Sequence, residues 1–187
     1  AGLAFPYLHD KINGDQIEIV PVEPYSCPTL TKAPFVYDYG DTAKVAPIAP
    51  MHSLGHTFVP PPIHAGGLRY HGMAPQVSQA VAQGLMKPLA VHQLECYEAA
   101  ITFARTEGII IAPETSHAVA VAIQEAKKAK EEGKEKVILF NMSGHGLMDL
   151  RGYDLYFKGK LHDYEYPVEE IHKALEEIKD FPKPVSS

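Results

Sequence analysis

Val137-Ile138-Leu139-Phe140-Asn141-Met142-Ser143-Gly144-His145-Gly146 is the stretch around which this chain is organised. Its apolar start is rich in β-branched and aromatic residues, which predicts a buried strand of a parallel sheet. The Ser-Gly-His-Gly loop then lies at the carboxyl end of that strand, where open α/β sheets bind ligands. Ser143 offers a hydroxyl, and the flanking glycines let the backbone approach a ligand closely. Taken alone, the pattern also fits a strand that ends in an ordinary glycine turn.

Apolar runs and helical patterns alternate before this stretch, at residues 75–85, 89–91, 96–105, 109–111 and 117–132. Strands that alternate with helices are joined by right-handed crossovers into a parallel sheet. The sequence therefore predicts an α/β fold with helices on both faces of a parallel sheet. Gly108 is expected to end one helix, and Thr115 or Ser116 to cap the next.

The flanking regions are less regular. We expect a helix at residues 2–11, a strand at 17–22, an amphipathic helix at 168–178, and a long functional or covering loop at 25–62. His52 and His56 have a spacing that would suit a metal on a helix, but Gly55 and the surrounding prolines disfavour a helix there.

Composition excludes several classes of protein. The formal net charge of −6 over 187 residues gives no electrostatic attraction for nucleic acid or an anionic membrane. No apolar run is long enough to cross a bilayer, and the first residues do not form a signal peptide. Cys27 and Cys96 are far apart in the sequence and predict free thiols in a reducing cytoplasm.

Two of the predicted strands end in polar residues. Glu114 follows the run at 109–111, and Ser143 follows the run at 137–140. Because the carboxyl ends of parallel strands lie at one edge of a sheet, we expect both side chains to meet at one ligand. The helix dipole favours an ionised Glu114, although a carboxylate at a helix start needs no ligand to explain it.

A second glycine cluster, Gly66-Gly67, is followed by Arg69. The glycines allow backbone contact with a ligand, and the guanidinium can bind a carboxylate through two parallel hydrogen bonds. A surface turn with an exposed arginine explains the same residues equally well.

Three motifs in one order carry a resemblance to a known family: His64-Ala65-Gly66-Gly67-Leu68-Arg69-Tyr70, Ala112-Pro113-Glu114-Thr115-Ser116-His117-Ala118 and Phe140-Asn141-Met142-Ser143-Gly144-His145-Gly146-Leu147-Met148-Asp149. Together they resemble the tryptophan synthase β chain. Arg69, His145 and the Pro-Pro-Pro-Ile run before the first motif resemble the divergent second class of that family. The resemblance covers nearly the whole chain and fades after about Lys160.

This resemblance implies a pyridoxal-phosphate-dependent lyase of fold type II that joins L-serine and indole to give L-tryptophan. It implies that Ser143 hydrogen-bonds the pyridine nitrogen of the cofactor, which leaves that nitrogen neutral. It further implies that Glu114, Gly66, Gly67 and Gly144 bind the cofactor and that Arg69 binds the substrate. Family members bind a monovalent cation, sodium or potassium, through backbone carbonyls, and the matching positions are Glu23, Tyr70 and Gly72.

Several parts of the family pattern have no counterpart in this sequence: the Schiff-base lysine, the Gly-Gly-Gly-Ser-Asn phosphate loop and the glutamate that assists proton transfer at indole. We therefore expect residues 1–160 to be a portion of the cofactor domain, residues 161–187 to form a carboxyl-terminal helix and tail, and the amino-terminal part of the enzyme to be missing. The chain alone is expected to contain no catalytic residue and to be inactive.

The resemblance also implies a cytoplasmic homodimer in tryptophan biosynthesis, with an α subunit as a further partner and no nucleic acid or membrane. Two other functions remain open from the residues. One is another fold-type-II enzyme of β-replacement or elimination, such as a serine deaminase. The other is a non-catalytic subunit that retains part of the ligand pocket.

Overall fold

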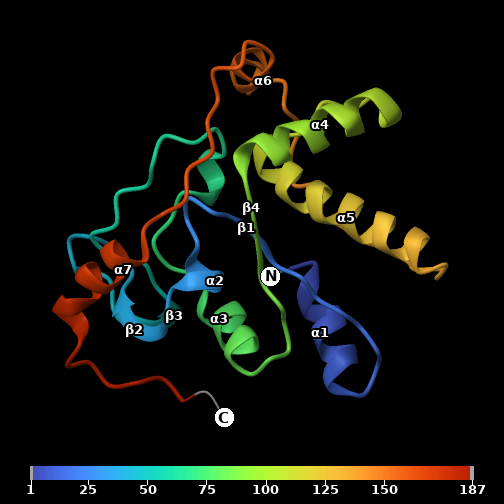
Figure 1. Cartoon of the computed structure of the whole chain (residues 1–187). Coiled ribbons are helices and arrows are strands. Elements are labelled where there is room, and N and C mark those ends of the chain that lie inside the picture. The colour runs from blue at the N-terminus through green and yellow to red at the C-terminus, as the bar shows by residue number, and fades with distance from the viewer. Residues whose placement is uncertain (1, 186–187) are drawn as a thin grey trace. The chain divides into compact units, whose positions relative to one another are not determined.

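The computed structural model describes residues 2–185, which form two compact units. The first unit contains residues 2–61, 69–90 and 165–185, and the second contains residues 62–68 and 91–164. Both are assembled from segments that are far apart in the sequence, and each is described here by itself (Figure 1). The domain boundary that we expect at residue 160 concerns the complete enzyme and stays a prediction.

In the second unit, α4 (Gln93–Glu107) and α5 (Pro113–Glu131) pack along each other (Figure 1). Gly108 ends α4 with a φ of +72°, as expected for a left-handed C-cap. α5 begins four residues earlier than the helical pattern indicates, because Pro113 occupies the first turn, where its missing N–H costs nothing. Thr115 and Ser116 therefore lie buried inside the first turn, and the prediction that one of them caps the helix is wrong.

The predicted strand at residues 137–140 does not form. Val137 is 98% exposed, and the one ring contact of this run is Phe140 packed edge-to-face on Phe103, with centroids 5.8 Å apart. Of residues 109–111, only Ile111 pairs, in an isolated antiparallel bridge with His145. A strand satisfies its backbone groups only through a neighbour, and within residues 2–185 no strand lies beside either run. The short η1 (Gly66–Leu68) and α6 (Leu150–Phe157), which we did not anticipate, complete this unit.

The first unit contains a parallel strand pair, β1 (Val22–Pro24) with β4 (Leu89–Val91), of which Val91 lies beyond the unit boundary. Lys87 N donates to Ile19 O and Leu89 N donates to Pro21 O, both at 3.0 Å. Residue numbers increase in the same direction on both sides of this pair, as they do between parallel strands. The α/β class with parallel pairing is thus confirmed, although β1 begins later than the predicted strand at 17–22. α1 (Ala4–Ile12) and α3 (Pro75–Ala82) form where expected and pack on a shared apolar cluster around Leu30, Val77, Ala80 and Met86.

The predicted loop at residues 25–62 contains regular structure. α2 (Thr29–Lys32) is followed by an antiparallel hairpin of β2 (Phe35–Tyr39) and β3 (Ile48–His52), in which Phe35 faces His52 and Tyr39 faces Ile48. β3 was not predicted because it contains Pro50, and proline within an apolar run normally argues against a strand. The helix expected at 168–178 forms as α7 (Val168–Leu175) and η2 (Glu176–Ile178), and it buries Ile171 against Leu54.

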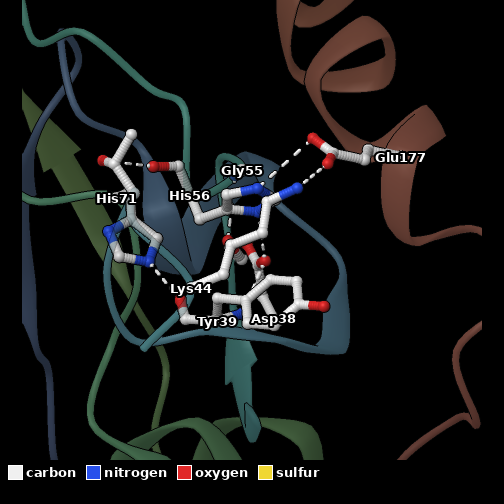
Figure 2. A network of polar contacts seen from close by, with 9 residues as sticks. Asp38, Tyr39, Lys44, Gly55, His56, His71 and Glu177 are labelled. Carbon is white, nitrogen blue, oxygen red and sulfur yellow. Dashed lines mark hydrogen bonds and ion pairs between the residues drawn. The ribbon is translucent and has the colours of Figure 1, made fainter. Parts of the chain in front are cut away.

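A buried polar network connects the hairpin with η2 inside the first unit (Figure 2). Asp38 is fully buried; it accepts a hydrogen bond from Ser53 Oγ at 2.5 Å and lies 2.7 Å from His56 Nδ1. The other ring nitrogen of His56 lies 3.3 Å from Glu177, which also pairs with Lys44. His56 is thus occupied on both sides by carboxylates, and among residues 2–185 no group of three or more His, Cys, Asp and Glu side chains is arranged to hold a metal.

Close packing of α7 on the hairpin gives a testable expectation for Gly55. Its φ is +96°, and a Cβ there would lie 2.6 Å from Ala174 Cβ. Gly55→Ala is expected to lower the free energy of local opening of α7 by about 3 kcal/mol, from left-handed strain plus overpacking. Amide hydrogen exchange of α7 in the complete protein measures this.

Gly84 provides the matched control, because its φ is +72° but nothing lies within 4 Å of an added Cβ. Gly84→Ala is expected to cost about 1 kcal/mol locally, from backbone strain alone, and to leave exchange in α7 unchanged. Equal exchange in α7 for the two variants would contradict the packing argument.

Candidate functional site

Ser143 is exposed at its loop, and its hydroxyl lies 3.0 Å from Thr115 Oγ1 in the buried first turn of α5. Thr115 Oγ1 also lies 3.3 Å from the carbonyl oxygen of Gly144, which can only accept a hydrogen bond. A hydroxyl carries one proton but accepts through two lone pairs. Thr115 therefore either donates to Gly144 and accepts from Ser143, or donates to Ser143. In the second arrangement the proton of Ser143 is free for an acceptor on a ligand.

Glu114 precedes Thr115 in the same turn of α5. Its Oε1 accepts a hydrogen bond from Gly67 N at 2.8 Å. A Cβ on Gly67 would lie 3.3 Å from Glu114 Cγ and Oε1, so the close approach favours glycine at this position. Gly66 next to it has nothing within 4 Å of an added Cβ, which leaves open space beside the backbone.

The structure thus brings together most of the expected cofactor residues at the first turn of α5. Glu114 contacts Gly67, and Thr115 joins Ser143 and Gly144 to the same turn. The route differs from the expected one, because these residues meet through helix contacts and a short antiparallel bridge instead of adjacent parallel strands. Ala112 N donates to Gly144 O at 2.9 Å within that bridge. The roles of these residues remain predictions.

Arg69 and the three expected cation-site residues belong to the first unit. Arg69 is exposed, and its guanidinium donates to Pro60 O at 3.3 Å. Glu23 is 1% exposed, and both of its carboxylate oxygens accept hydrogen bonds from Thr29, Leu30 and Thr31 at 2.6–2.9 Å. The side chain of Glu23 therefore holds the start of α2, a role that the sequence did not reveal.

Tyr70 and Gly72 lie in the segment that follows Arg69. Burial, with the nearby carboxyl of Glu23 and thiol of Cys27, raises the pKa of Tyr70 to about 12, so its hydroxyl is neutral at physiological pH. Gly72 pairs with Ser53 in an antiparallel bridge, and a Cβ there would collide with Met51 Sδ. Gly72 thus has a packing reason for its identity, and the cation-binding role of Tyr70 and Gly72 stays a prediction.

His117 lies in the next turn of α5 and is 4% exposed. Its Nδ1 lies 2.8 Å from Pro113 O, and burial lowers the pKa of His117 below its ordinary value of 6.5. As the pH falls, His117 therefore becomes protonated at a higher pH in the unfolded chain than in the folded protein. The stabilisation is complete above about pH 6.5 and is lost as the pH falls through that value towards the folded-state pKa.

His117→Gln is accordingly expected to flatten the fall in stability below about pH 6.5, because the titrating ring is removed. Denaturant unfolding of the complete protein at a series of pH values checks this. His9→Gln, at a side chain that is 76% exposed, serves as the control for replacing a surface histidine. An unaltered profile for His117→Gln would refute the assignment.

Comparison with known proteins identifies the family. Residues 1–144 match the family described as pyridoxal-phosphate dependent enzymes. The chain belongs to this family. The match confirms the α/β, fold-type-II assignment made from the sequence.

Curated relatives within the family are tryptophan synthase β chains. The chain is 55% identical over 166 residues to the β chain of Thermococcus onnurineus, which covers 88% of this chain and 38% of that protein. It is 54% identical over 175 residues to the β chain of Pyrococcus horikoshii, covering 93% and 38%. It is 54% identical over 167 residues to the β chain 2 of Aquifex aeolicus, covering 87% and 38%. The resemblance is confirmed, and the chain spans 38% of the length of these relatives.

The residues at the first turn of α5 fit pyridoxal phosphate. The exposed hydroxyl of Ser143 is a neutral partner of the kind that a pyridine nitrogen accepts without becoming charged. Thr115, which we predicted to cap the helix, instead hydrogen-bonds Ser143 and so orients its hydroxyl. Its position directly after Glu114 in the sequence could have indicated that it belongs to the site. The open backbone at Gly66 offers a surface for a flat ring.

The expectation that this chain contains no Schiff-base lysine stays a prediction. The single His-Lys pair of the sequence, His172-Lys173, is exposed on α7. Cys27 and Cys96 are both buried free thiols, as expected. Among residues 2–185, no helix combines the length and the apolar character that crossing a membrane requires.

Proposed function

We propose that the complete protein is a tryptophan synthase of the β type, which replaces the β-hydroxyl of L-serine with indole to give L-tryptophan. The similarity to curated β chains supports this reaction class. The single structural observation that carries the proposal is the exposed Ser143 hydroxyl, oriented by Thr115 and located at the same helix turn as Glu114. When bound, pyridoxal phosphate withdraws electrons from the amino-acid substrate and so makes β-replacement feasible.

Each residue of the site has a distinct task in this proposal. Ser143 would donate a hydrogen bond from its hydroxyl to the pyridine nitrogen, which would stay neutral, and Thr115 would supply the compensating hydrogen bond. Glu114 holds the Gly67 amide and flanks the ring, while Gly66, Gly67 and Gly144 provide backbone surface against the cofactor. Arg69, which is exposed and makes one long hydrogen bond to Pro60 O at 3.3 Å, is proposed to bind the substrate carboxylate.

A monovalent cation is part of the same proposal. Because the carboxylate of Glu23 is committed to α2, the ion is bound by main-chain carbonyls of Glu23, Tyr70 and Gly72. We further propose a cytoplasmic homodimer that receives indole from an α subunit, which the designation of the relatives as β chains supports. The catalytic lysine and the phosphate loop are supplied by the part of the enzyme that this chain does not match in its relatives.

Turnover of a substrate panel by the complete protein tests the reaction. L-Serine with indole should give tryptophan at a higher kcat/KM than L-serine with thiols or than L-serine deamination. Deamination as the preferred reaction would favour a serine deaminase, and a protein without a visible cofactor absorption band would favour a non-catalytic subunit. Either result would reject the proposed function.

A further inference from the structure

The segment of residues 62–68, which carries the glycine pair, is fixed by two side-chain oxygens of the second unit. His64 N donates to Gln93 Oε1 at 2.9 Å, and Gly67 N donates to Glu114 Oε1 at 2.8 Å. Gln93 is the first residue of α4, and Glu114 is the second residue of α5. Both acceptors therefore stand on rigid helix ends, and the two anchored amides bracket Gly66.

Gln93 also reaches a third segment. Its Nε2 donates to His162 O at 3.0 Å, and the amide of the next residue, Leu94, donates to Asp163 Oδ1 at 2.9 Å. One carboxamide thus accepts from the glycine segment and donates to residue 162. A carboxylate can only accept and an aliphatic side chain can do neither, so both contacts require glutamine or a similar carboxamide.

We propose that Gln93 is a positioning residue that holds the Gly66–Gly67 backbone in place for the ring of pyridoxal phosphate; this rests on the proposed function. A glycine pair loses more conformational freedom on ordering than any other dipeptide. Without the anchor at His64, the segment keeps the bond from Gly67 to Glu114 and the burial of Ala65, and its amino-terminal side is held less tightly. The cofactor must then order this segment when it binds, and the entropic cost of that ordering lowers its affinity.

The experiment uses the complete protein with Gln93→Leu and Gln93→Glu. Gln124→Leu is the matched control, because Gln124 lies on α5 in the same unit and bonds Glu95 on α4 away from the glycine segment. Hydrogen exchange of the His64 and Gly67 amides is measured without cofactor. The Kd for pyridoxal phosphate and the values of kcat and KM for L-serine are measured separately.

Gln93→Leu is expected to speed exchange of both amides by about tenfold and to weaken pyridoxal-phosphate binding by about fivefold, as expected for the loss of one anchoring hydrogen bond. Gln93→Glu keeps the acceptor for His64 but loses the donor to His162, so smaller changes in the same direction are expected. Gln124→Leu should match the unaltered protein in every measurement. If Gln93→Leu does not fold, Gln93→Glu carries the same comparison.

Two results separate failure of this proposal from failure of the proposed function. Unchanged exchange, or faster exchange with an unchanged Kd for pyridoxal phosphate, overturns the positioning role while the function stands. Absence of pyridoxal-phosphate binding by the unaltered protein overturns the proposed function and the positioning role together.

Discussion

The 187-residue chain by itself is expected to form no tryptophan from L-serine and indole. The sequence contains no counterpart of the family's phosphate loop, and its one His-Lys pair is exposed on α7. Covalent attachment of the cofactor and binding of its phosphate normally supply most of the cofactor affinity and its orientation. Without them, Ser143 and Glu114 can contact the ring but cannot activate the amino acid. Tryptophan fluorescence or chromatography measures the product directly, and because the chain contains no tryptophan, the background is low.

Complementation provides the control for this expectation. Co-expression with the part of the Thermococcus onnurineus β chain that this chain does not match should restore both the cofactor absorption band and turnover. The apolar side chains that the isolated chain exposes, among them Val137 at 98% and Leu139 at 59%, should then become protected from solvent. Turnover by the isolated chain above the buffer background would refute the assignment of the catalytic groups to the unmatched part.

Ser143→Asp in the complete protein is expected to lower tryptophan formation by on the order of 100-fold. A carboxylate at this position would hold the pyridine nitrogen protonated, because an adjacent negative charge favours the charged form. The cofactor then becomes a stronger electron sink, which favours competing reactions of L-serine over replacement. Thr115, 3.0 Å away, would donate to the new carboxylate and stabilise it in the ionised form.

Ser143→Ala separates the charge from the lost hydrogen bond. Removing one neutral hydrogen bond should cost about tenfold in kcat/KM, with little change in the ratio of tryptophan to deamination product. Ser143→Asp should change that ratio and shift the absorption spectrum of the bound cofactor. If both variants lose activity equally and keep the native product ratio, the hydroxyl does not control the protonation of the ring.

The strand predictions show where sequence reasoning failed. Residues 137–140 have the composition of a buried strand, yet they form none, because a strand is completed by a partner that the local sequence does not contain. The hairpin of β2 and β3 was missed for the opposite reason, since Pro50 and an irregular pattern disguised strands that do have a partner. Glu114 and Thr115 are neighbours in the first turn of α5, and Thr115 contacts Ser143, whereas the prediction that Glu114 and Ser143 meet at one ligand stays a prediction.

The sequence by itself determined the family and most of the helices, but neither α2 nor α6. Amphipathic spacing located α1, α3, α4, α5 and α7, and Gly108 ended α4 as expected, because the hydrogen bonds of a helix are made between neighbours in the chain. Only the tertiary structure decided which distant groups become partners: Glu23 holds α2, His56 lies between two carboxylates, and Gln93 anchors the glycine segment. Such contacts join residues from separate parts of the chain, so their geometry depends on packing that no local pattern contains.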